Sequence, residues 1–206
     1  MTQLPVFTTT DETSVVLDDD SNSTERVYSI LTLAFANDPP NRWMYPEPAQ
    51  YLRYFPLFAR ALGGAAIANR TGFANRDYTA VALWLSPEAG PDEEALTNLI
   101  ETSVPAEKKA DLGAVIDQMI KLHPKGPHWY LPFIGVDPAK QGRGFGTALL
   151  RPMLARCDEA GLPAYLESTN PKNQPLYERL GFKAMGEIKV GHCPPIVPML
   201  RPPIRS

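Results

Sequence analysis

Cysteines, long apolar runs and an N-terminal leader pattern are scarce or missing in this sequence. Its 206 residues include only two cysteines, Cys157 and Cys193, which are too few for a disulfide framework or for the usual zinc spacings. No stretch approaches the roughly 20 apolar residues that span a membrane. Met1 to Pro5 carry neither the basic nor the apolar region of a signal peptide. We therefore expect a cytoplasmic protein without a metal site or a membrane partner.

Positive charge is not in excess either. The net charge is -3, which gives no electrostatic reason to expect nucleic acid as a partner. A hydrophobic content of 44% with 21% charged residues is ordinary for a globular protein. At this length we expect a single domain over residues 1–206, in which residues 1–24 form a partly flexible segment. Composition leaves open whether the protein is a monomer or a homodimer.

Glycine, by contrast, is concentrated in one stretch. An apolar run from His128 to Val136 predicts a strand, and Asp137-Pro138 predicts its end. Three glycines follow at alternate positions, and apolar residues then recur with helical spacing from residue 148 to residue 157. Pro132 is awkward within the strand because proline cannot donate to a ladder, so we expect an irregularity there.

A strand, a glycine loop and a helix in this order are typical of an anion site. The first N–H groups of a helix have no intrahelical partner, and the helix dipole favours negative charge beside them. Glycines let the backbone close around the anion, and Arg143 adds a fixed positive charge. The spacing fits neither a Walker loop nor G-x-G-x-x-G. The stretch therefore predicts a site for a phosphate-bearing ligand of another kind.

The rest of the chain alternates helices and strands between proline-rich loops. Apolar periodicity and turn residues define each expected element. The expected helices cover residues 24–36, 48–62, 91–105, 106–122, 148–160 and 173–180, and the expected strands residues 15–17, 65–69, 78–85, 128–136, 163–169, 182–190 and 196–200. No internal repeat is present.

Two motifs resemble those of one family. Gln141–Gly146 resembles the Q/R-x-x-G-x-G/A signature of the GNAT acetyltransferase superfamily, and Asn170–Phe182 is similar to its N-x-x-A-x-x-L-Y-x-K-x-G-F segment. Asn173 stands where the family has a small residue, and Arg179 where it has lysine. The two motifs in the right order are more specific than either alone. The resemblance covers about residues 129–199.

The resemblance implies an α/β (α+β) fold, with a mixed, mostly antiparallel sheet between helices and a splayed pair of strands. It also implies acetyl-CoA as the acetyl donor. The pantetheine arm would follow Ile134, Gly135 and Val136, with Gly135 at a bulge that separates the two strands. The residues expected to hold the pyrophosphate are Gln141, Gly142, Arg143, Gly144, Phe145, Gly146 and Thr147.

Two side chains are candidates for the proton transfers. Tyr177, which stays protonated at neutral pH, is the candidate acid for the leaving thiolate, although it also fits a packed tyrosine. Glu167, near the end of the adjacent strand, is the candidate base, directly or through water, although it also fits a structural carboxylate. Asn170 and Asn173 are candidates for cofactor contact or for turn and cap roles.

The acceptor is harder to identify. Candidates for lining its pocket are Asp38, Trp43, Trp84, His128 and Trp129, each of which also fits ordinary packing or a solvated loop. We expect transfer of an acetyl group to a primary amine of a small molecule by direct attack. Two alternatives stay open: acetylation of a peptide or protein, and a non-catalytic acyl-CoA-binding sensor.

Overall fold

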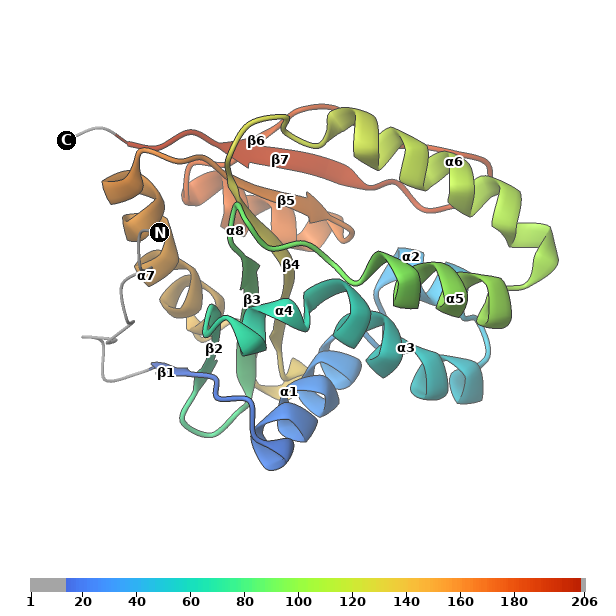
Figure 1. Ribbon diagram of the computed structural model, residues 1–206, viewed down its shortest axis with the longest axis horizontal. Helices are drawn as coiled ribbons and strands as arrows, with labels where there is room; N and C mark the ends of the chain where they lie inside the picture. The colour runs from blue at the N-terminus through green and yellow to red at the C-terminus, as the bar shows by residue number, and fades with distance from the viewer. Residues whose placement is uncertain (1–13, 205–206) are drawn as a thin grey trace.

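A seven-stranded sheet forms the centre of the computed structural model, which describes residues 14–204 (Figure 1). The strands are β1 (Ser14–Val16), β2 (Gly72–Asn75), β3 (Ala80–Leu85), β4 (Trp129–Val136), β5 (Ala164–Ser168), β6 (Lys183–Ala184) and β7 (Val197–Arg201). Their order across the sheet is β1-β2-β3-β4-β5-β7-β6, and only β4 and β5 pair in parallel. The expected mixed, mostly antiparallel sheet is confirmed.

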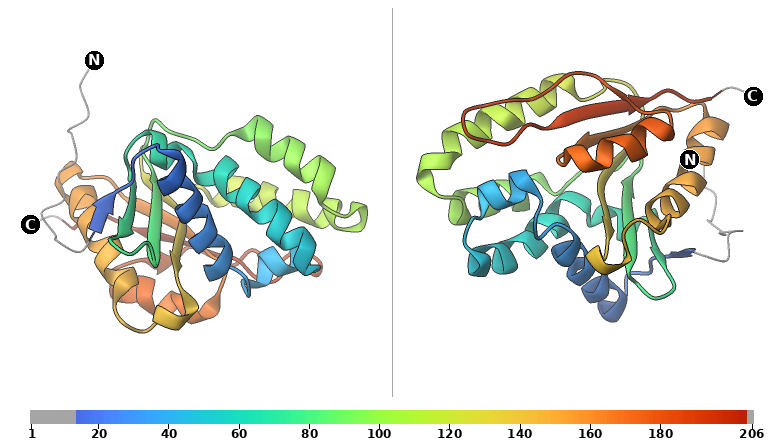
Figure 2. Two further views of the ribbon diagram at one scale, coloured as in Figure 1. Left: turned by 90° about the horizontal axis from the view of Figure 1, so that it is seen from below. Right: turned by 180° about the vertical axis from the view of Figure 1, so that it is seen from behind.

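Helices cover both faces of the sheet (Figures 1 and 2). They are α1 (Ser21–Ala34), α2 (Pro39–Met44), α3 (Pro48–Gly63), α4 (Ala65–Ala68), α5 (Glu93–Ser103), α6 (Ala106–Leu122), α7 (Phe145–Ala160) and α8 (Gln174–Arg179), with short 3-10 turns at Pro138–Lys140 and Pro171–Asn173. One buried cluster joins α1 and α3 to one face, and a second joins α7 and α8 to the other. No helix among residues 14–204 combines the length and the apolar character needed to cross a bilayer.

Pro132 sits at the irregularity that its chemistry predicts. The pairing of β3 with β4 shifts between Leu83, which faces Phe133, and Leu85, which faces Tyr130. The extra residue on β4 reverses the side-chain alternation: Leu131 packs against the α7 face and Phe133 against the α1–α3 face. Phe133 thereby joins an aromatic group of Phe35, Phe55 and Phe58.

The bulge expected at Gly135 is therefore wrong. Gly135 pairs regularly with Val81, and the irregularity lies upstream of it. A Cβ at Gly135 would lie 3.0 Å from both Ala34 Cβ and Leu31 Cδ2. The glycine lets α1 pack closely on β4, which is a packing reason for its presence.

Two expected strands are also corrected. Residues 65–68 form helix α4, because their Ala-rich sequence favours a helix over a strand, and β2 begins only at Gly72. Of the strand expected over residues 182–190, only β6 pairs with β7, and Ile188 adds a single bridge to Ile196. Residues 1–13 of the expected N-terminal segment lie outside the described residues, whereas residues 14–16 form β1 and α1 begins at Ser21.

Helix α1 starts earlier than its sequence pattern predicts. Its cap is Asp20, whose carboxylate accepts a hydrogen bond from the Ser23 backbone N–H at 2.9 Å. The acidic turn of Asp18 to Asp20 therefore has a local structural role at its last residue.

A buried ion pair connects β7 to α7. Arg201, which is 3% exposed, donates from its two terminal nitrogens to the Asp158 carboxylate at 2.7 Å each, and from Nε to the Leu180 carbonyl at 2.9 Å. The backbone N–H of Ile204 donates to the same carboxylate. Removing the aspartate would leave a guanidinium buried without its charge partner, which is costly.

We expect Asp158→Asn to lower the free energy of unfolding by about 2–3 kcal/mol, measured by urea denaturation. The Arg201 hydrogen bonds hold the pKa of Asp158 below its usual value. The wild-type pair therefore stabilises the fold above about pH 4, and this stabilisation is lost as pH falls through the lowered pKa. The variant should lack that part of the acid dependence. Glu159→Gln, at the exposed neighbour, is the control, and equal denaturation midpoints for both variants would contradict the account.

Candidate active site

A cavity of about 860 Å³ opens where β4 and β5 diverge. The two strands pair only through Trp129 with Ala164 and Tyr130 with Tyr165. Beyond that point Pro132 has no N–H to donate, and Phe133 of β4 and Glu167 of β5 line the cavity. The expected splay is present, and it begins at Pro132 rather than at Gly135.

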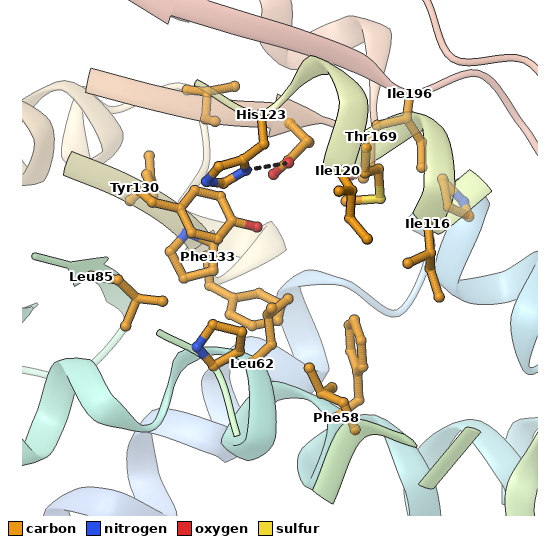
Figure 3. Close-up of a pocket in the computed structure, with 18 of the residues that line it drawn as sticks. Phe58, Leu62, Leu85, Ile116, Ile120, His123, Tyr130, Phe133, Thr169 and Ile196 are labelled. Carbon is orange, nitrogen blue, oxygen red and sulfur yellow. Dashed lines mark ion pairs between the residues drawn. The ribbon is translucent and has the colours of Figure 1, made fainter. Parts of the chain in front are cut away.

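The cavity wall is mostly apolar (Figure 3). Side chains from α3, α5 and α6 contribute Phe58, Leu62, Ile100, Ile116 and Ile120. Two carboxylates occur among the lining residues. Glu93 is exposed in the first turn of α5, whereas the Glu167 side chain is only 7% exposed. Within the apolar interior, Glu167 is therefore the buried negative charge.

Tyr177 lines the cavity from the opposite face of the sheet. It lies on α8, is 6% exposed, and packs edge-on against Phe182. Burial, together with the nearby Asp38 carboxylate, raises the pKa of Tyr177 well above its usual value. The phenol stays protonated at neutral pH and has a proton to donate.

Glu167 lies close to the imidazole of His123 and to the phenols of Tyr130 and Tyr165. Its Oε1 is 3.8 Å from Nδ1 of His123. Burial and the Glu167 charge raise the pKa of both Tyr130 and Tyr165. The Tyr165 hydroxyl is buried and has no hydrogen-bond partner among residues 14–204. The carboxylate therefore occupies a site with little access to water.

Two histidines continue outward from this carboxylate. His123 Nε2 lies 2.9 Å from His128 Nε2, and His128 Nδ1 lies 2.7 Å from the Gly126 carbonyl oxygen. Burial lowers the pKa of His128. His128 was a weak candidate from the sequence. His123 was not considered, although it precedes His128 by only five residues in the same turn.

The glycine loop has the geometry of an anion site. Gly142 and Gly144 have φ of 75° and 85°, and nothing lies within 4 Å of where their Cβ atoms would be. Phe145 then begins α7, so the free N–H groups of its first turn face the loop. Arg143 is exposed beside them. Open space, free amides and a cation fit a diphosphate.

The loop meets the cavity at the start of α8. A Cβ on Gly146 would lie 3.2 Å from Leu176 Cδ2 and 3.8 Å from Ile134 Cδ1. Leu176 directly precedes Tyr177, and Ile134 lines the cavity. Gln141, at the other end of the loop, donates from Nε2 to the Val136 carbonyl at 3.2 Å. The fold thus brings the two sequence motifs together.

The remaining candidates divide between cavity and core. Trp43 and His128 line the cavity, whereas Trp84 and Trp129 are buried in the core on the α7 face, which confirms packing for these two. Asp38 is 5% exposed and lies just behind the wall, where it accepts hydrogen bonds from Asn41 and Thr169.

The two asparagines of the second motif also differ. The side chain of Asn170 accepts from the Lys172 N–H at 3.1 Å, which is a turn role, while Asn173 lines the cavity. Among the described residues no group of three or more His, Cys, Asp and Glu side chains is arranged to hold a metal ion.

Comparisons with known proteins agree with this architecture. The profile described as "Acetyltransferase (GNAT) family" matches residues 110–182. An uncharacterized N-acetyltransferase of Schizosaccharomyces pombe is 46% identical over 54 residues, which are 26% of this chain and 22% of that relative. The matched stretch is therefore about a fifth of that relative's length.

Solved structures match over nearly the full chain. A Corynebacterium glutamicum protein described as histone acetyltransferase HPA2 and related acetyltransferase is 28% identical, with a TM-score of 0.62 over 94% of this chain and 98% of that one. Arylalkylamine N-acetyltransferase 2 of Aedes aegypti shares the fold at 14% identity, with a TM-score of 0.60 over 92% of this chain and 98% of that one. Together with the glycine loop and the splayed strands, these matches show that the chain has a GNAT-like acetyltransferase fold.

Proposed function

We propose that this protein is an acetyl-CoA-dependent N-acetyltransferase that acts on a primary amine of a small molecule by direct transfer. One observation carries the proposal. Tyr177 lines the cavity that contains the buried carboxylate of Glu167. Its neighbour Leu176 contacts the glycine loop. A loop with the geometry of an anion site, a buried phenol and a buried carboxylate around one space, in a fold shared with acetyltransferases, support the proposal.

Each side chain has a distinct role in this proposal. Acetyl-CoA supplies an acetyl group on a thioester. Residues 141–147 hold its diphosphate, and the exposed edge of Ile134, Gly135 and Val136 positions its pantetheine arm and offers an N–H to the developing oxyanion. Glu167 takes a proton from the amine, and Tyr177 gives one to the leaving thiolate. Asn173, on the cavity wall, contacts the cofactor or the acceptor.

The cavity favours an amine with an apolar body. Glu167 would hold the ammonium group, while Phe58, Ile116 and Phe133 surround the rest of the molecule. A second positive charge would lie against these apolar side chains without a partner and would lose its hydration.

A more specific acceptor comes from sequence resemblance. The glycine loop and the segment Tyr177–Phe182 resemble those of puromycin N-acetyltransferase, so an aminonucleoside belongs among the acceptors to be tested. Peptide or protein acetylation is the second candidate, which the name of the C. glutamicum relative favours. A cavity walled by helices α2, α3, α5 and α6 fits a small molecule better than an extended peptide.

A thiol-release assay with a panel of amines tests this function. We expect kcat/KM for 2-phenylethylamine to exceed that for agmatine by about 100-fold. Agmatine carries a second charge, and leaving that charge poorly solvated would cost about 3 kcal/mol, which corresponds to this ratio. Puromycin and a lysine peptide complete the panel. Turnover of the peptide alone would overturn the small-molecule assignment, and tight acetyl-CoA binding without turnover of any amine would favour the sensor.

The walls themselves can be tested with one variant. Ile116→Asp places a second carboxylate in the apolar part of the cavity wall, so it should raise kcat/KM for agmatine relative to 2-phenylethylamine. Ala110→Asp, at an exposed position of α6 that does not line the cavity, is the matched control with the same change of charge. An unchanged ratio in both variants would contradict the proposed position of the acceptor.

We further propose that the enzyme is cytoplasmic and acts as a monomer or a homodimer.

A further inference from the structure

A line of polar side chains leads from the buried Glu167 to the surface. The carboxylate faces His123 Nδ1, the two histidines meet through their Nε2 atoms, and His128 Nδ1 reaches the Gly126 carbonyl. Residues 125–127 of this turn are exposed, and His123 and His128 are half-buried. The histidines therefore connect a carboxylate that is 7% exposed to bulk water.

The hydrogen bonds determine which nitrogens carry protons. A carbonyl oxygen only accepts, so His128 Nδ1 carries the proton in its bond to Gly126. Because burial lowers the pKa of His128, the ring is neutral and its Nε2 accepts. The proton between the two rings must then belong to His123 Nε2. In a neutral His123 this leaves Nδ1 without a proton, facing Glu167.

We propose that His123 and His128 form a proton relay that carries away the proton that Glu167 takes from the acceptor. This inference rests on the proposed function and extends it. The charged and titratable groups around the relay are Glu167, Tyr130 and Tyr165, of which the two phenols stay neutral because burial and Glu167 raise their pKa. Of these three groups, only the carboxylate exchanges a proton with His123.

The transfer balances at each step. An N–H bond of the ammonium breaks as an O–H bond forms on Glu167. That O–H bond breaks as an N–H bond forms at His123 Nδ1, and the proton on His123 Nε2 passes to His128 Nε2. The proton on His128 Nδ1 then leaves to water. Both rings return to their starting tautomers by exchange with solvent at the exposed turn.

The relay matters most for an acceptor that is charged. Acetylation of an ammonium releases one net proton to solvent. An arylamine that is neutral at the assay pH releases no net proton. It loses one proton to Glu167, and Tyr177 gives one proton to the thiolate. A histidine that only supports the cavity wall would affect both acceptors alike, so the two amines separate relay from structure.

The test compares wild type with His128→Gln on an alkylammonium and on a neutral arylamine of similar shape. We expect about a tenfold loss of kcat/KM for the ammonium and less than about a twofold loss for the arylamine. At fixed pH and ionic strength, added imidazole should restore the variant on the ammonium and leave wild type unchanged. His123→Gln should show the same selective loss.

Other results distinguish the two proposals. Equal losses on both amines, or a variant that imidazole does not restore, would overturn the relay while leaving the acetyltransferase assignment in place. Absence of wild-type turnover on either amine would overturn the proposed function and the relay with it. Melting temperatures of both variants, compared with wild type, separate a folding defect from a selective loss.

Discussion

Tyr177→Phe is expected to lower kcat by about 100- to 1,000-fold, because the leaving thiolate loses its proton donor. The phenol has the properties of such a donor. It lines the cavity, it is 6% exposed, and burial raises its pKa so that it stays protonated at neutral pH. Phenylalanine keeps the contact with Phe182 and removes only the hydroxyl. Thiol release at saturating acetyl-CoA measures the effect, and KM for acetyl-CoA should change by less than about threefold.

A matched control removes a hydroxyl of similar burial elsewhere. Tyr28 on α1 is 5% exposed, its pKa is likewise raised by burial, and it does not line the cavity. Tyr28→Phe should leave kcat within about twofold of wild type. If Tyr177→Phe retained wild-type kcat, the phenol would have no part in proton transfer and would be a packing residue.

Glu167→Gln is expected to lower kcat/KM for an ammonium acceptor by about 100- to 1,000-fold near neutral pH. Glutamine keeps the size of the side chain and its place in the cavity, but it can neither hold the ammonium charge nor take a proton. Raising the pH toward the pKa of the acceptor should restore activity, because more of the amine then arrives deprotonated. A pH profile of kcat/KM shows this as a rise of about tenfold for each pH unit until that pKa is reached.

Glu93 supplies the control for this prediction. It also lines the cavity, but it is exposed in the first turn of α5. Glu93→Gln should change kcat/KM by less than about threefold, because an exposed charge is screened by water. Should the two glutamine variants behave alike, or should Glu167→Gln match wild type, another group would be the base. Asp38, buried behind Thr169, is the first one to examine.

Local chemistry explains what the sequence predicted well. The glycine loop, the end of α7 and the short helix α8 depend on residues that are near one another along the chain. Gly142 and Gly144 do take positive φ, and Gly161 ends α7 in the left-handed conformation. These preferences belong to glycine itself and need no tertiary information.

Pairing between distant segments explains what the sequence could not fix. Pro132 indicated an irregular strand, but only its position opposite β3 and β5 decides that the bulge reverses the alternation and directs Phe133 toward the cavity. Helix α4 was mistaken for a strand because a short run of small apolar residues suits either element until its neighbours are known.

The contacts around the candidate site could not be predicted from the sequence for the same reason. Asp38 and Thr169 are 131 positions apart, yet the hydroxyl donates to the carboxylate. His123, in the turn before β4, comes near Glu167 and Tyr165 of β5 only when the chain is folded. No spacing rule within either segment predicts such contacts.

The central claim is that the backbone N–H groups after Val136 bind a diphosphate and thereby direct the thioester toward Tyr177. A crystal structure with bound coenzyme A tests it most directly. The account predicts the diphosphate against the N–H groups of residues 142–147, with the sulfur within about 3.5 Å of the Tyr177 hydroxyl. A nucleotide bound elsewhere, or a sulfur far from that oxygen, would contradict it.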